Sequence, residues 1–77
     1  MPMKNFTKSA SSTGNLTQRE KQVLVHMSEG LSTVQIAHAV KLSALTIETH
    51  RKSIMRKLKA PNAVGAVAMA IRLKLID

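Results

Sequence analysis

The stretch SALTIETHRKSIMRKL, residues 43–58, combines a regular apolar repeat with a dense run of cations. At 100° per residue, Ile47, Ile54 and Leu58 fall at about 180–220° from Leu45, on one side of an α-helix. Four polar side chains gather on the opposite side, within about 60° of Leu45: Glu48, Thr49, Lys52 and Arg56. The pattern predicts a helix over about residues 44–58 that buries one side and leaves a narrow charged face open.

Two capping signals predict a pair of shorter helices before this one. Thr17 and Glu20 have the spacing of a capping box, in which each side chain accepts a hydrogen bond from the other residue's backbone N–H. Ser32 and Gln35 repeat the same device. The residues expected to face the core after the two boxes are Val23, Leu24, Met27, Ile36, Ala37 and Val40.

A very short connection joins the second of these helices to the cationic one. It consists of the three residues Lys41 to Ser43, and Ser43 is placed to cap the longer helix with its hydroxyl. Two short helices joined by such a turn, with the second strongly basic, form the helix-turn-helix pattern.

The remainder of the chain predicts one more helix and no strand. Pro61 ends the cationic helix, because the residue before a proline is driven out of the α region. Asn62 can then cap a fourth helix over about residues 63–73. Residues 1–15 have almost no apolar periodicity and predict a disordered tail or linker. We therefore expect an all-α fold, a four-helix bundle containing a helix-turn-helix, over residues 16–77.

The charge balance indicates a polyanionic partner. The 77 residues carry 12 Lys and Arg against 4 acidic residues, a net charge of +8, which favours nucleic acid or an anionic membrane. A single aromatic residue, Phe6, argues against recognition of single strands by base stacking. No apolar run is long enough for a membrane span and no signal-peptide core is present. We expect a soluble protein of the bacterial cytoplasm, associated with the nucleoid and not with a membrane.

The sequence gives no sign of catalysis or of a metal centre. It contains no cysteine, no paired carboxylates and no glycine-rich phosphate loop. The histidines at positions 26, 38 and 50 are twelve residues apart, which is not the spacing of zinc ligands. The prediction is a protein that is not an enzyme and binds neither cofactor nor metal.

The charged face of residues 44–58 offers two kinds of contact to DNA. Long cations such as Lys52 and Arg56 reach guanine O6 and N7, and Thr49 can meet a thymine methyl or a phosphate. Glu48 can accept from cytosine N4, or it can pair with Lys52 one turn on; both interpretations stay open. The candidates for reading bases are Glu48, Thr49, Lys52 and Arg56. The candidates for phosphate contacts, at helix starts and along the flanks, are Ser32, Thr33, Thr46, His50, Arg51 and Lys57.

Four segments together resemble the LuxR-type DNA-binding domain of GerE-, FixJ- and NarL-like regulators. They are LTQREKQVL (16–24), EGLSTVQIA (29–37), SALTIETHRKSIMRKL (43–58) and AVAMAIRLKLID (66–77). The resemblance implies a four-helix fold whose third helix reads the groove through Glu48, Thr49 and Lys52, with phosphate contacts at Thr46 and Lys57. It also implies dimerisation on DNA through the fourth helix, for which the candidates are Val64, Ala68 and Ile71.

The chain departs from the family pattern at a few positions. Lys41 and Lys74 stand where the family usually has glycine, so Lys41 is expected near the left-handed region of the backbone at some energetic cost. Ala63 replaces a usual arginine and Gly65 a usual glutamate. The differences at positions 63, 65 and 74 concern the fourth helix and its dimer contact, not the fold.

The function that these observations predict is a transcription regulator that binds double-stranded DNA sequence-specifically as a homodimer. RNA polymerase is a further candidate partner. One alternative is a promoter-reading module of the sigma-factor type, which has similar LTxRE and IA signatures. Another is a helix-turn-helix module that docks a protein partner. The chain is expected to be either a stand-alone regulator, which the initial Met-Pro-Met favours, or a fragment of a longer one.

Overall fold

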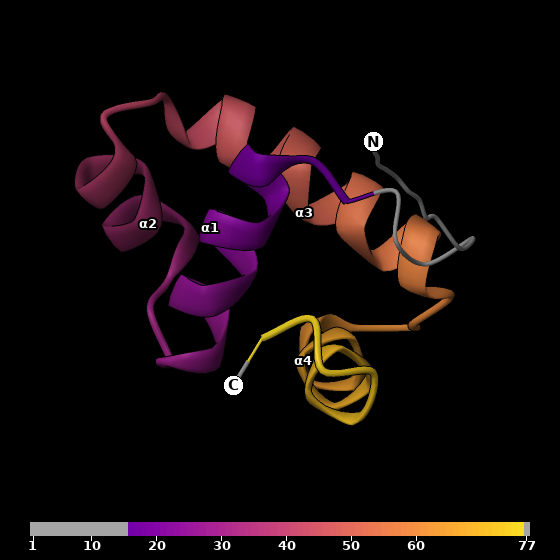
Figure 1. The fold of residues 1–77 in the computed structure, drawn as a ribbon. Helices are drawn as coiled ribbons and strands as arrows, with labels where there is room; N and C mark the ends of the chain where they lie inside the picture. Colours follow the sequence, from indigo (N-terminus) through magenta and orange to yellow (C-terminus); the bar gives the residue numbers. More distant parts are fainter. Residues whose placement is uncertain (1–15, 77) are drawn as a thin grey trace, which may run out of the picture.

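Four helices make up the described part of the protein, residues 16–76 of a computed structural model. They are α1 (Gln18–Ser28), α2 (Thr33–Val40), α3 (Ala44–Leu58) and α4 (Ala63–Arg72), and residues 16–76 contain no strand (Figure 1). The all-α prediction is confirmed, and α3 has the predicted bounds. The predicted tail, residues 1–15, lies outside the described residues.

The helices begin at the predicted caps. At α1, Thr17 Oγ1 accepts from the N–H of Glu20 at 3.0 Å, and Glu20 Oε1 accepts from the N–H of Thr17 at 2.9 Å. Ser32 and Gln35 form the equivalent box at α2, with distances of 3.2 and 2.8 Å. The other two helices have single caps, Ser43 for α3 and Asn62 for α4. Because each cap satisfies otherwise orphaned amides, the local sequence determines where every helix starts.

Lysines occupy three backbone positions that favour glycine. Lys41 follows α2 with φ 60° and ψ 45°, the left-handed conformation expected from the sequence. Lys59 after α3 and Lys74 after α4 have φ of 55° and 59°. A residue with a Cβ in this region costs roughly 1–2 kcal/mol. The fold therefore carries backbone strain at the ends of three helices.

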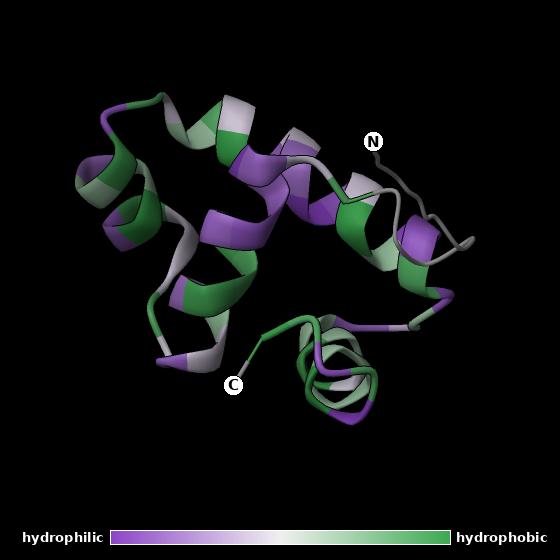
Figure 2. Cartoon of the chain, in the orientation of Figure 1, coloured by the Kyte–Doolittle hydropathy of each residue, from purple (hydrophilic) through white to green (hydrophobic). Residues whose placement is uncertain are grey.

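The core forms where α1 and α3 meet, since each of these two helices contacts all the others, whereas α2 and α4 make no contact within the described residues. Apolar and hydrophilic residues alternate along α1, α2 and α3, whereas α4 is apolar over most of its length (Figure 2). The largest fully buried side chains are Val23, Leu24, Ile36, Ile47, Ile54 and Leu58. From α4 the buried residues are the small Ala66 and Ala70, and Ile76 covers the core from the C-terminal segment.

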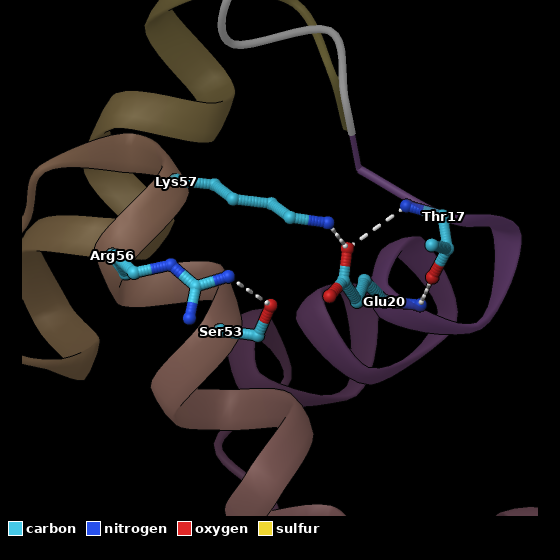
Figure 3. A network of polar contacts seen from close by, with 5 residues as sticks. All are labelled: Thr17, Glu20, Ser53, Arg56 and Lys57. Carbon is cyan, nitrogen blue, oxygen red and sulfur yellow. Dashed lines mark hydrogen bonds and ion pairs between the residues drawn. The ribbon is translucent and has the colours of Figure 1, made fainter.

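A partly buried ion pair joins the start of α1 to the end of α3 (Figure 3). Glu20 is only 4% exposed, and its Oε1 accepts from Lys57 Nζ at 2.8 Å as well as from the Thr17 N–H. Burial raises the pKa of Glu20, but hydrogen bonds from Lys57, the Thr17 amide and Ser53, with the charge of Lys57, together bring that pKa below its ordinary value of 4.5. The carboxylate form is thus favoured by folding.

The variant Glu20→Gln separates the charge of this residue from its capping role. Glutamine supports the same box at α2, so α1 should keep its start while the ion pair is lost. We expect the free energy of unfolding at pH 7 to fall by about 1–3 kcal/mol. Because the folded-state pKa of Glu20 is lowered, its stabilisation is present above the unfolded pKa and disappears as the pH falls through the folded pKa. The difference between wild type and variant should therefore shrink toward acid pH.

Urea denaturation followed by circular dichroism at pH 7 and at about pH 3 measures this difference. Glu29→Gln is the control, because the carboxylate of Glu29 is 55% exposed and should matter little at either pH. A difference between wild type and Glu20→Gln that stays constant with pH would show that the ionised carboxylate is not what stabilises the fold.

The strain at Lys41 predicts a second stability effect. Lys41→Gly removes the Cβ from a left-handed position and should raise the free energy of unfolding by about 0.5–1 kcal/mol. Lys41→Ala removes the charge but keeps the Cβ, so it should bring no such gain. Urea denaturation of both variants checks the prediction, and an equal gain in the two would attribute the effect to charge instead of backbone.

Candidate nucleic-acid interface

The helix-turn-helix predicted from the sequence is present in the structure. α2 ends at Val40 and α3 begins at Ala44, and the two helices pack against each other. The turn is closed by two backbone bonds, from the N–H groups of Lys41 and Leu42 to the carbonyl of Ala37, the second at 3.0 Å. The left-handed backbone at Lys41 makes this sharp reversal, so the turn fixes α3 relative to α2.

The two sides of α3 differ as the periodicity predicted. Ile47 and Ile54 are fully buried and Leu58 is 2% exposed, which anchors the helix along most of its length. The opposite side is open to solvent through the four predicted base-reading residues, Glu48, Thr49, Lys52 and Arg56. The structure therefore presents one polar face of a firmly held helix.

Glu48 has a partner on the neighbouring helix. Its Oε2 accepts from Thr33 Oγ1 over a long 3.5 Å, which links the side of α3 to the first residue of α2. No ion pair joins Glu48 to Lys52 in the described part of the chain, so the alternative of an i,i+4 pair is not found here. A predicted base reader and a predicted phosphate contact are thus neighbours.

The hydroxyls at the start of α3 already have partners within the protein. Ser43 Oγ lies 2.8 Å from Thr46 Oγ1 and accepts from the Thr46 N–H at 3.1 Å. Thr49 Oγ1 donates to the carbonyl oxygen of Leu45 at 3.2 Å. Ser32, the cap of α2, is exposed but bonded to the amide of Gln35. These contacts fix the side chains that lie nearest to the two helix starts.

The remaining candidates lie on the flanks of α3. His50 and Arg51 are partly exposed, whereas the ammonium of Lys57 is held by Glu20 and its side chain is only 21% exposed. Sequence reasoning missed this pairing. The capping role of Glu20 was readable from its spacing, but a second partner 37 residues away depends on how α1 and α3 pack.

A second surface, on α4, is apolar. Val64 is 80% exposed and Ile71 48% exposed, with Ala68 also exposed between them. These three predicted dimer residues line a shallow groove between α4 and the end of α1. The other residues of the groove are Met27, Ser28, Gly30, Ala63 and Val67.

Residues 16–76 hold no cluster of three His, Cys, Asp or Glu side chains that could bind a metal ion. Within the same residues no helix is both long and apolar enough to span a membrane.

Comparison with known proteins identifies the family. A family model described as bacterial regulatory proteins, luxR family (GerE), matches residues 14–70. The chain belongs to this luxR family. It is a family of regulatory proteins and not of enzymes, and the match favours the LuxR-type interpretation of the sequence over the sigma-factor one.

Two regulatory proteins are similar in sequence to most of this chain. The response regulatory protein YgeK of Escherichia coli K12 is 36% identical over 63 residues, which are 82% of this chain and 43% of YgeK. The transcriptional regulatory protein FixJ of Rhizobium meliloti 1021 is 39% identical over 56 residues, 73% of this chain and 28% of FixJ.

The crystal structure of ChrA, a response regulator of a heme-sensing two-component system, has the same fold. It superposes with a TM-score of 0.79 at 32% identity, over 90% of this chain and 33% of ChrA. The luxR-family chain thus spans less than half the length of each of these three relatives.

Proposed function

We propose that this luxR-family chain is the sequence-specific, double-stranded DNA-binding part of a transcription regulator, with α3 in the major groove. The observation that carries the proposal is the pair of opposite sides on α3: an isoleucine seam that is fully buried, and a polar face that is exposed to solvent. A major groove about 12 Å wide admits one α-helix, provided that the helix projects from the protein and is held rigidly.

Position along α3 separates the candidates for base contacts. The first turns of a recognition helix approach the base edges most closely, which supports Glu48 and Thr49 as base readers. Lys52, in the middle of α3, would reach the bases through its long side chain. Arg56 shares their face but lies in the last turn, about 16 Å along the axis from Leu45. Among the four candidates, Arg56 would therefore lie nearest to the edge of the groove.

The phosphate contacts proposed for this face come from helix starts and from the flanks of α3. Backbone N–H groups at the starts of α2 and α3 favour an anion, and Ser32, Thr33 and Thr46 lie there. His50 and Arg51 supply the flank. Lys57 stays a candidate, but a phosphate would compete with Glu20 for its ammonium.

We further propose that two copies bind paired half-sites through α4, with Val64, Ala68 and Ile71 at the contact. The exposed apolar groove on α4 supports this, because apolar patches on a small domain are costly to leave in water. RNA polymerase remains a proposed partner, and the nucleoid the proposed location.

Selection of bound duplexes from a random pool, using the purified protein, tests the function directly. A recovered motif supports sequence-specific binding, and dyad symmetry in it supports the dimer. Binding without any motif would favour the alternative of a module that docks a protein.

The proposal predicts different effects for a base contact and a phosphate contact. Lys52→Ala should reduce discrimination between the selected motif and random duplex by about 1–3 kcal/mol. Arg51→Ala should weaken binding to both duplexes alike, and lower the slope of log affinity against log salt by about 1. Arg51 suits this comparison better than Lys57, whose loss would also break the Glu20 ion pair.

Fluorescence anisotropy with the two duplexes at several salt concentrations measures both effects. Equal losses of discrimination in the two variants would show that Lys52 is not a base reader.

If two copies bind through α4, a substitution on α4 should affect the affinity for a duplex with two half-sites but not for one with a single half-site. Val64→Glu places a charge in the apolar face of α4, while a glutamate in the first turn of a helix is compatible with the helix dipole. We expect weaker binding to a duplex with two half-sites and unchanged binding to one half-site. Gel-shift titration of both duplexes measures these affinities, and Val25→Glu on α1 is the control. If Val64→Glu and wild type bind the duplex with two half-sites equally well, α4 is excluded as the dimer contact.

A further inference from the structure

The most exposed large apolar residue of α3 lies in the middle of its polar face. Leu45 is the second residue of the helix and is 79% exposed. At 100° per residue Thr49, Lys52 and Arg56 all fall within about 40° of it. A single exposed leucine is ordinary on a protein surface, but this one projects from the same face of α3 as the proposed base-reading side chains.

Thr49, one turn further on, adds a second apolar group. Its hydroxyl donates to the carbonyl oxygen of Leu45 at 3.2 Å, so the hydroxyl is already satisfied within the helix. The hydroxyl oxygen can still accept a hydrogen bond, and the methyl group of Thr49 is open to an apolar contact. Leu45 and the methyl group of Thr49 together form a small apolar patch between the charged side chains of this face.

We propose that Leu45, with the methyl group of Thr49 beside it, contacts the C5-methyl group of a thymine in the major groove and selects for that base. The thymine methyl is the one apolar group that base edges present there, and apolar side chains are its usual partners. The position also fits, because residues of the first turns of a recognition helix approach the bases most closely.

This inference rests on the proposed function, since it needs α3 in the groove. It adds a specificity determinant that is neither charged nor a hydrogen-bonding group. Such a contact excludes water from both surfaces and discriminates thymine from cytosine, which has no methyl group at C5.

The test replaces thymines by deoxyuridine, which lacks only the C5-methyl group. Each thymine of the selected motif is replaced in turn, and affinity is measured for wild type, Leu45→Ala and the control Val25→Ala, whose residue is a 40% exposed apolar side chain on α1. At one thymine, wild type and Val25→Ala should lose about 4-fold in affinity, the effect of burying one methyl group. Leu45→Ala should bind the thymine duplex more weakly than wild type and lose clearly less than about 4-fold with deoxyuridine there, because only the methyl group of Thr49 remains at the contact.

The outcomes distinguish this inference from the proposed function. If selection yields no motif, the proposed function fails. If a motif is found but deoxyuridine weakens Leu45→Ala as much as wild type, or weakens neither, the contact is excluded while sequence-specific binding stands. Circular dichroism of Leu45→Ala checks that the exposed substitution leaves the helices intact.

Discussion

The structure depends on how firmly one side of α3 is buried. A domain of this size has a thin core, and a charged helix gains little from burial unless it contributes large apolar side chains. Ile47, Ile54 and Leu58 supply them, spaced so that all three enter the same core from one side of the helix. Because this seam takes up one side only, the other side is released for polar residues without loss of stability. The arrangement of all four helices follows from that division, since α1, α2 and α4 each pack on α3.

The polar contacts of the domain reinforce the same helix. Glu20 is at once the N3 residue of α1 and the partner of Lys57 near the end of α3, so one carboxylate fixes a helix start and an interhelical contact. Its burial is tolerable because two donors compensate for lost hydration: the Lys57 ammonium and the Thr17 amide. At the other end of α3, the turn at Lys41 is sharp and short. The helix that carries the proposed interface is thus held at both ends.

Local signals in the sequence predicted most of the fold. The caps at Thr17, Ser32, Ser43 and Asn62 involve residues three apart, and the seam of α3 follows from periodicity alone. What could not be predicted are contacts whose geometry exists only after packing: the bond of Lys57 to Glu20 and that of Thr33 to Glu48. Exposure of the polar face was predictable for the same reason as the seam. Which residues of this polar face would contact DNA could not be predicted, because that depends on the geometry of the bound duplex.

The side of α4 that packs on the core is built from small residues. Ala66 and Ala70 are fully buried, and the distance between two packed helices depends on the side chains at their contact. α4 packs directly on α3, so a dimer formed through α4 would join the two copies of α3 through this packed contact. In the proposed dimer, these two alanines would therefore help to determine how far apart the two copies of α3 lie, and with it the number of base pairs between half-sites.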